Sequence, residues 1–283
     1  MPYADKRQLN VSVFEDTRNW YSQDAMLKDA ICHSKQHTKF YAPGAVSPAP
    51  EMLTRFPEDM HILVSSERTL QAAGKYAGQK VAVLNFASAT NPGGGVLRGS
   101  SAQEEALCRC STLYPCLLGN DLWQSYYQMH RAQHDVTYTD ACIYTPDVLV
   151  IKTDTNSPER LSKDKIYPVD VITCAAPNLR PQPNNYMNPG HGVPVRLTRE
   201  QIRTLHLQRA RKILSVAAIH GAEVLILGAF GCGAFCNPPE VVAGAFRDIL
   251  PDFAHAFRTV EFAVYCTPRD DSNYRTFQQI LTR

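Results

Sequence analysis

Short apolar runs alternate with longer segments of helical periodicity through most of the chain. The apolar runs predict strands, because runs of about four to eight such residues are typical of strands buried in a sheet; they lie at 61–65, 81–86, 171–176, 223–228 and 260–266. Apolar positions at helical spacing predict helices, which lie at 67–76, 102–113, 197–221 and 240–250. Strands that alternate with helices indicate an α/β fold in which helices cover both faces of one sheet.

The beginning of the chain has a different pattern. Charged and apolar positions alternate at helical spacing over residues 1–36, and the Pro-bearing segment 41–52 is typical of a connector. We therefore expect residues 1–60 to form an N-terminal helical extension packed on a core domain of residues 61–283. Within that domain, residues 145–196 contain an irregular Pro- and Asn-rich stretch, NLRPQPNNYMNPGHG, which predicts a long surface loop.

Two of the predicted strands end in glycine-rich segments that lead into helices. The first segment contains Gly93, Gly94 and Gly95, and the second contains Gly228, Gly231 and Gly233. Ligands of α/β sheets bind beyond the carboxyl ends of the strands, and the backbone N–H groups of glycine loops and helix N-termini favour phosphate. Two such loops facing one crevice would suit a diphosphate; the alternative is that each is only a tight turn. Neither has the GK[ST] ending of a P-loop or a GxGxxG that opens a helix, so a dinucleotide redox fold is disfavoured.

Two acidic residues follow the first glycine segment in the first turn of a predicted helix. Gln103, Glu104 and Glu105 come after seven intervening residues. Successive helical residues point about 100° apart, so the two carboxylates cannot have the same role. One interpretation is structural, since Ser101 and Glu104 have the spacing of a capping box. The other is catalytic, since a carboxyl group held beside a bound anion has a raised pKa, as the general acid of glycosidic cleavage requires.

Composition and charge exclude several classes of protein. The formal net charge is only +2. This near-neutral balance excludes both a strongly basic protein that coats nucleic acid and a protein with an acidic tail. No run approaches the ~18 apolar residues of a membrane helix, and the charged start MPYADKRQLNVSVFEDTRNW lacks the apolar segment of a signal peptide. The nine cysteines are scattered and include no CxxC pair. We therefore expect an intracellular protein, cytoplasmic or nuclear and not secreted, with free and mostly buried thiols.

Two other polar groups have simple interpretations. His130 and His134 are spaced like a zinc pair, but Arg131 replaces the glutamate of HExxH, so we expect surface residues and no metal site. The basic run RTLHLQRARK (203–212) predicts the solvated face of an amphipathic helix.

The segment from the first glycine loop to the two glutamates resembles a known catalytic signature. GGGVLRGSSAQEE (93–105) resembles the GGG-x6–8-QEE signature of the poly(ADP-ribose) glycohydrolases. The segments NFASATNPGGG, LCRCSTLY, YTPDVLV, VITCAAPN and LGAFGCGAFCNPP resemble, in order, the bacterial-type or microbial branch over about residues 60–270. The resemblance implies a three-layer α/β/α macrodomain-like fold, in which a mixed central sheet lies between helices and binds ADP-ribose.

The resemblance also implies roles for individual residues. Glu105 would be the catalytic acid, which protonates the leaving 2′-oxygen of the ribose–ribose bond and, once ionised, activates the attacking water. Glu104 would hydrogen-bond the ribose hydroxyls instead of capping the helix, and Gln103 would support the loop. Phe235 would pack on the distal ribose; a plain core position is the alternative. The other substrate-binding residues would be Asn85, Ser88, Gly93, Gly94, Gly95, Val96, Gly231, Cys232, Gly233 and Ala234.

Two departures separate this chain from the animal-type enzymes of the family. Asn85 and Ser88 stand where those enzymes have an acidic residue and an amide. The animal-type enzymes also cover the adenine with a tyrosine on a separate insertion, and the resemblance assigns no residue of this chain to the adenine.

The implied function is hydrolysis of poly(ADP-ribose) to ADP-ribose, from the free chain end and without a metal or other cofactor. The substrate would be carried by modified proteins, and no direct binding to duplex nucleic acid or membrane is expected. Such an activity would reverse ADP-ribosylation, as in the DNA damage response. Two alternatives stay open: a hydrolase of mono-ADP-ribose or another ADP-ribosyl conjugate, and a non-catalytic ADP-ribose-binding macrodomain. The latter needs the glycine loops but not Glu105, so the complete QEE segment disfavours it.

Overall fold

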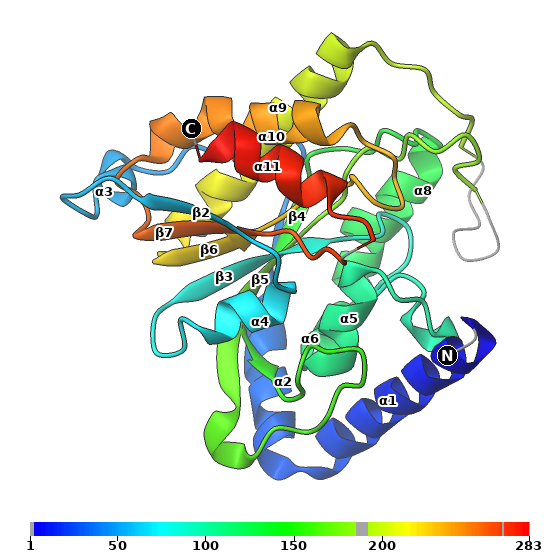
Figure 1. The fold of residues 1–283 in the computed structure, drawn as a ribbon. Coiled ribbons are helices and arrows are strands. Elements are labelled where there is room, and N and C mark those ends of the chain that lie inside the picture. The colour runs from blue at the N-terminus through cyan, green and yellow to red at the C-terminus, as the bar shows by residue number, and fades with distance from the viewer. Residues whose placement is uncertain (1–2, 185–191, 268, 283) are drawn as a thin grey trace.

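Seven strands form one mixed sheet in the computed structural model, which describes residues 3–184, 192–267 and 269–282 (Figure 1). The strands are β1 (Lys39–Tyr41), β2 (His61–Ser65), β3 (Val81–Phe86), β4 (Cys142–Val150), β5 (Tyr167–Cys174), β6 (Val224–Leu227) and β7 (Thr259–Ala263). Their order across the sheet is β1-β4-β5-β3-β6-β7-β2. Neighbours from β5 to β2 run parallel, whereas β4 pairs antiparallel with both β5 and β1.

Helices cover both faces of the sheet, as the alternating pattern predicts (Figure 1). One face carries α9 (Arg199–Ile219), α10 (Pro239–Ile249) and α11 (Ser272–Leu281). The other carries α1 (Tyr3–Gln23), α2 (Ala25–His37), α4 (Thr69–Gly74), α5 (Gln103–Cys110) and α6 (Leu113–Cys116). The shorter elements are α3 (Pro50–Leu53), α7 (Asn120–Leu122), a π-helix (Trp123–Gln128), α8 (Met129–Gln133) and the 3-10 turns η1 (Val96–Arg98), η3 (Lys163–Lys165) and η4 (Leu250–Phe253). Among the described residues, no helix has both the length and the apolar character needed to span a bilayer.

Strand β3 shows how the sequence builds both layers of the core. Val81 and Val83 pack toward α4 and α5, while Ala82 and Leu84 pack toward α9 and α10. A strand covered on both faces needs an almost continuous apolar run, which this segment has. Side chains alternate along a strand, so Asn85 at its end lies on the α5 face.

The first 60 residues contain the expected helices and also one strand. α1 and α2 together span residues 3–37. The N-cap of α2 is Asp24, whose Oδ1 accepts the backbone N–H of Leu27 at 3.2 Å. β1 then joins the sheet through antiparallel pairing with β4. The division of the chain at residue 60 stays a prediction.

Residues 145–196, the range in which the sequence predicts an irregular stretch, also contain most of β4 and all of β5. The two strands stay paired across a β-bulge, where Asp147 has a φ of 52° and its N–H donates to the Asp170 side chain at 3.1 Å. The bulge contains the pair Pro146-Asp147. Pro and Asp are common in turns, but here they interrupt the pairing of a strand that continues beyond them. Residues 178–184 lie outside helices and strands, as expected for the loop, and residues 185–191 of that loop lie outside the described part of the chain.

The basic run 203–212 on α9 is only partly the solvated face that its spacing predicts. Arg203 is half-buried and Arg211 is exposed, and they form ion pairs with Asp248 of α10 and Asp252 of η4. Arg209 and Lys212 are buried. Arg209 donates to the carbonyl oxygens of Ala175 at 2.8 Å and Thr137 at 2.5 Å. Lys212 donates to the carbonyl oxygens of Ala42 and Gly44, in the connector 41–52, at 2.7 Å each. The prediction is therefore wrong for Arg209 and Lys212. A buried cation needs hydrogen-bond acceptors, and here these are carbonyl oxygens far away in the sequence, which the local pattern of α9 does not indicate.

The prediction of two surface histidines is correct for His134 and wrong for His130. His130 is buried, and its ring nitrogens bond to the carbonyl oxygen of Tyr126 at 2.9 Å and to Oγ1 of Thr139 at 2.8 Å. Burial lowers the pKa of His130 to about 4. Over the described ranges, no group of three or more His, Cys, Asp or Glu side chains could hold a metal ion.

Candidate active site

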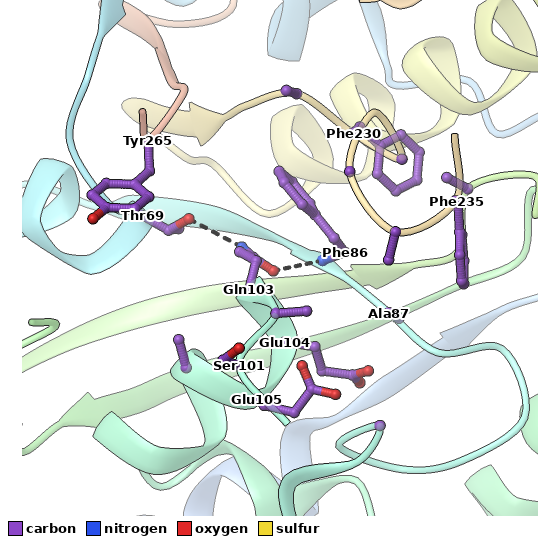
Figure 2. A pocket seen from close by; sticks show the side chains of 18 of the residues that line it. Thr69, Phe86, Ala87, Ser101, Gln103, Glu104, Glu105, Phe230, Phe235 and Tyr265 are labelled. Atoms are coloured by element: carbon purple, nitrogen blue, oxygen red, sulfur yellow. Dashed lines mark hydrogen bonds between the residues drawn. The ribbon is translucent and has the colours of Figure 1, made fainter. Parts of the chain in front are cut away.

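A cavity of about 640 Å³ lies at the carboxyl ends of the parallel strands. Its walls come from residues 86–88 after β3, 229–235 after β6 and 263–265 at the end of β7, and residues 100–106 bring the start of α5 into it (Figure 2). The carboxyl ends of parallel strands meet at one edge of a sheet, where ligands of α/β proteins bind. The two glycine loops therefore face one common cavity.

The first glycine loop wraps around the two glutamate side chains. Gly94 has a φ of 58°, and a Cβ there would lie 2.6 Å from Oε1 of Glu105 and 3.0 Å from Oε2 of Glu104. Gly93 has a φ of 67°, and a Cβ there would lie 2.7 Å from the ring of Tyr114. Both positions require glycine, for the backbone angle and for the close approach of these side chains.

Glu105 lines the cavity from the first turn of α5 and is 7% exposed. Its Oε1 accepts the backbone N–H of Gly95 at 2.8 Å. Its Oε2 is buried, and none of the described residues donates a hydrogen bond to it. Burial raises the pKa of Glu105, and the N–H of Gly95 and the charge of Arg109 oppose that rise only in part. The side chain is thus a protonatable group on the cavity wall, with one oxygen held by Gly95 and the other without a hydrogen-bond partner among the described residues.

Glu104 lies beside Glu105 and is held by different partners (Figure 2). Its Oε2 accepts the backbone N–H of Ser88 at 2.7 Å, and its Oε1 accepts the side-chain amide of Asn85 at 3.4 Å. Burial, and then the charge of Glu105, raises the pKa of Glu104 well above its ordinary value. The two carboxylates therefore have different surroundings, as the angle between successive helical residues predicts.

The capping-box interpretation of Ser101 and Glu104 is wrong. The N-cap of α5 is Ala102, and among the described residues no side-chain capping hydrogen bond is made at this N-terminus. Glu104 turns instead toward the end of β3, where Ser88 and Asn85 donate to it.

Gln103 and Asn85 join α5 to the end of β3. Gln103 donates to the carbonyl oxygen of Leu84 at 2.7 Å and to Oγ1 of Thr69 at 3.1 Å. Its Oε1 accepts the N–H of Phe86 at 2.9 Å (Figure 2). Asn85 is fully buried behind Glu104, which it contacts through its amide. These bonds set the position of α5, and with it both glutamates, relative to the sheet.

The second glycine loop follows β6 and is held by a buried network. Gly231 has a φ of 79°, and a Cβ there would lie 2.6 Å from both Cβ of Ala176 and Nδ2 of Asn237. Asn237 donates to three backbone carbonyl oxygens at 2.7, 3.1 and 3.3 Å. His206, buried on α9, donates from Nε2 to Oδ1 of Asn237 at 2.8 Å, and burial lowers its pKa to about 4. The loop is therefore anchored by a neutral histidine, and Phe235 forms part of the cavity wall beyond it.

The structure brings most of the predicted site residues together. Those on the cavity wall are Ser88, Gly94, Gly95, Gln103, Glu104, Glu105, Gly231, Gly233, Ala234 and Phe235. Four predicted residues do not line the cavity themselves: Asn85, Gly93, Val96 and Cys232.

Several wall residues are missing from the sequence prediction. Arg68 and Tyr265 line one end of the cavity, with the Arg68 guanidinium 4.1 Å from the centroid of the Tyr265 ring. They follow β2 and β7, so the position of strand ends at one sheet edge could have indicated them. Asp154 is also on the wall, almost fully buried, and burial raises its pKa; no sequence signal points to it.

Comparison with known proteins identifies the family. Residues 12–153, half of the chain, match the model of the microbial-type PARG catalytic domain, where PARG denotes poly(ADP-ribose) glycohydrolase. The chain belongs to the microbial-type PARG family. The resemblance seen in the GGG and QEE segments is thus confirmed.

Solved PARG structures are similar over nearly the whole chain. PARG from Thermomonospora curvata is 31% identical with a TM-score of 0.79, and covers 96% of this chain and 99% of its own. The same enzyme bound to the inhibitor ADP-HPD is 33% identical, with a TM-score of 0.76 and coverage of 98% and 99%. PARG from Deinococcus radiodurans in complex with ADP-ribose is 33% identical, with a TM-score of 0.71 and coverage of 89% and 96%. No curated protein matches the chain.

The PARG comparisons confirm the expected fold and class of enzyme. The three-layer α/β/α arrangement with a mixed sheet is that of the PARG structures. The matched range of the family model contains the first glycine loop and both glutamates, while the second glycine loop lies beyond it. Membership places the chain among glycosidases that act on poly(ADP-ribose).

Proposed function

We propose that the protein releases ADP-ribose from the free end of poly(ADP-ribose) by hydrolysing ribose–ribose O-glycosidic bonds. Family membership supports this activity, and the similar structures include PARG complexes with ADP-ribose and with ADP-HPD. The observation that carries the proposal is the carboxyl group of Glu105, buried at the cavity wall, with Oε1 bound to Gly95 and Oε2 unbonded within the described chain.

Glu105 acts first as general acid and then as general base. In its protonated form, which burial favours, it gives its proton to the 2′-oxygen of the departing ribose as the bond from that oxygen to C1″ breaks. An oxocarbenium-like ribose forms, and the nearby diphosphate stabilises its positive charge. Ionised Glu105 then takes a proton from water while the water oxygen bonds to C1″, which regenerates the acid.

Glu104 has a binding role in this proposal. Both of its oxygens already accept hydrogen bonds, from Ser88 and Asn85, so it is oriented to accept further ones from ribose hydroxyls. A single carboxylate then serves both chemical steps, unlike the two-carboxylate arrangement of most glycosidases.

The two glycine loops receive the diphosphate between them. Gly94 and Gly95 line the cavity beside Glu105, and Gly231 and Gly233 line it from the loop after β6. Backbone N–H groups that approach closely in such loops suit phosphate oxygens. Phe235, at the end of the second loop, packs on the distal ribose.

The adenine base stacks at the end of the cavity formed by Arg68 and Tyr265. The Tyr265 ring is 47% exposed although it is large and apolar, and it already stacks with a guanidinium. Bases stack on aromatic rings and on arginine planes. A purine that enters this end has a flat partner on Tyr265.

The proposal extends to the cellular setting of the enzyme. Nine unpaired cysteines, five of them buried, favour a reducing, intracellular compartment. The net charge of +2 gives no basic field for duplex nucleic acid. We infer a protein that reverses ADP-ribosylation, including in the DNA damage response, with residues 61–283 as the catalytic domain and residues 1–60 as its extension.

Side-by-side reactions test the proposed function. Poly(ADP-ribose) and a mono-ADP-ribosylated protein are incubated with the enzyme, with and without EDTA, and released ADP-ribose is measured by mass. We expect release from the polymer, at the same rate with EDTA, and none with Glu105→Gln. Release only from the mono-ADP-ribosylated protein would favour the mono-ADP-ribosyl hydrolase, and binding without release from either would favour a non-catalytic macrodomain.

A further inference from the structure

The N-terminal helix α1 touches the segment that ends the first glycine loop. Asn10 is 4% exposed, and its Nδ2 donates to the carbonyl oxygen of Gly99 at 2.9 Å. α1 is in contact with η1 and with α5. Removing one partner of a buried hydrogen bond leaves the other without compensation, so the amide of Asn10 holds this carbonyl in place.

The backbones of α1 and of this segment are also in close contact. Gly99 has a φ of 73°, and a Cβ there would lie 2.2 Å from the carbonyl oxygen of Arg7. The approach is possible only because residue 99 is glycine. The position of the segment therefore depends directly on the position of α1.

The start of the loop rests on α1 through one side chain. The ring of Phe14 meets the ring of Tyr114 edge to face, with centroids 5.0 Å apart and an interplanar angle of 88°. Tyr114 in turn lies under Gly93, where a Cβ would come within 2.7 Å of its ring. Both ends of the segment 93–99 are thus linked to α1, one through Tyr114 and Phe14 and the other directly at Gly99.

The N–H group that holds the carboxyl of Glu105 lies between these two ends. Gly95 donates to Glu105 at 2.8 Å. The helix that carries Glu105 is linked to α1 as well, because Thr17 donates to the carbonyl oxygen of Arg109 at 2.6 Å. Arg109 donates onward to the carbonyl oxygen of Ser100 at 2.5 Å. α1 therefore contacts both sides of the Gly95–Glu105 hydrogen bond, the loop and α5.

We propose that α1 positions the catalytic loop and that Asn10 is a positioning residue, which keeps Gly95 aligned with Glu105 through Gly99. The expected effect on turnover rests on the proposed role of Glu105, whereas the expected effect on the order of the loop does not. Arg7 and Asn10 precede the range of the family-model match, which begins at residue 12.

The substitution Asn10→Ala, with Ser12→Ala as its matched control, tests the proposal. Ser12 is exposed on the same helix, and its hydroxyl bonds only within α1, to Gln8. We expect Asn10→Ala to lower kcat about tenfold, because a small misplacement of a catalytic group has effects of this order. The affinity for ADP-ribose, measured by calorimetry, should change less than about threefold, since the second loop and Tyr265 are untouched. Hydrogen exchange of residues 93–101 should rise, and Ser12→Ala should leave all three quantities unchanged.

A second pair of variants keeps the test decisive if Asn10→Ala does not fold. Thr17→Val keeps the shape of the side chain without its hydroxyl, and Thr17→Ser keeps the hydroxyl. We expect faster exchange of residues 93–101 and lower kcat in Thr17→Val, and values near wild type in Thr17→Ser. Unchanged exchange, or raised exchange with unchanged kcat, in the folded variants would overturn the proposal. If the wild-type protein does not cleave poly(ADP-ribose), the proposed function fails, and the exchange difference still decides whether α1 orders the loop.

Discussion

The two glycine loops enter one cavity, but their surroundings differ. In the first loop, a Cβ at Gly94 would collide with the carboxylates of Glu104 and Glu105, so the loop is closed around acidic side chains. In the second loop, a Cβ at Gly233 would have no neighbour within 4 Å among the described atoms. That loop is anchored from behind, at Gly231, by Asn237 and the neutral His206.

The contrast separates two tasks that look alike in the sequence. A loop that fits tightly around a carboxyl group controls the position and the protonation of that group. The second loop has open space at Gly233, on the cavity side, and close contacts with Asn237 at Gly231. Such a loop can present its backbone N–H groups to a ligand. We therefore expect changes in the first loop to reduce turnover and changes in the second to reduce binding.

The largest effect is expected for Glu105→Gln, which removes the proposed proton donor and retains the shape of the side chain. Turnover of poly(ADP-ribose) should fall about a thousandfold or more, because general acid–base catalysis contributes roughly 10²–10⁴. The affinity for ADP-ribose, measured by calorimetry, should stay within about threefold of wild type. Substantial residual turnover would assign the acid to another residue.

A matched pair of glycine substitutions tests the contrast between the loops directly. Gly94→Ala places a Cβ 2.6 Å from Oε1 of Glu105 at a φ of 58°, so kcat should fall about a hundredfold. Gly233→Ala enters open space and should leave kcat within about threefold. Steady-state rates on poly(ADP-ribose) compare the two variants, and equal losses in both would contradict the assignment of different tasks.

Phe235→Ala should weaken binding more than chemistry. Loss of the aromatic wall should raise the Kd for ADP-ribose about tenfold, which corresponds to ~1.4 kcal/mol. The value of kcat should change less than Kd, since Phe235 lies on the second loop. An unchanged Kd would show that Phe235 does not contact the ligand and would favour the alternative that it is a plain core residue.

The smallest effect concerns stability and pH. The folded state raises the pKa of Glu105 above its ordinary value of 4.5, so it favours the protonated form. The stabilisation of that form is fully present below pH 4.5 and is lost as the pH rises through the raised pKa. Glutamine does not titrate, so the Tm of Glu105→Gln minus that of wild type should increase as the pH rises from 4.5 through the raised pKa of Glu105. A difference that stays constant over this range would show that Glu105 is not held in its protonated form by burial.

The strands that matter most for the site could be predicted because they are buried on both faces. The runs at 81–86 and 223–228 are almost purely apolar, and each leads into a glycine-rich segment, with glycines at 93–95 after the first run and at 228, 231 and 233 at the end of the second. The strand β4 is harder to predict from the sequence, because Pro146 and Asp147 at its bulge are residue types that are common in turns. Local pattern alone cannot distinguish a bulge within a strand from the end of one.

Other features depend on partners that are far away in the chain. Arg209 and Lys212 have the spacing of a solvated face and are buried because distant carbonyl oxygens receive them. The Ser101–Glu104 spacing fits a cap, yet Glu104 binds Ser88 and Asn85 instead. Tyr265 stands near the end of a predicted apolar run, which indicates the ligand-binding edge of the sheet, but its position beside Arg68 depends on the pairing of β7 with β2.

A crystal structure of this protein with ADP-ribose tests the central claim most directly. We predict that the diphosphate lies between the loops of Gly95 and Gly231 and that the distal ribose lies within about 3 Å of Oε2 of Glu105. A complex in which Glu105 is remote from the ribose, or in which the diphosphate contacts neither glycine loop, would contradict the account.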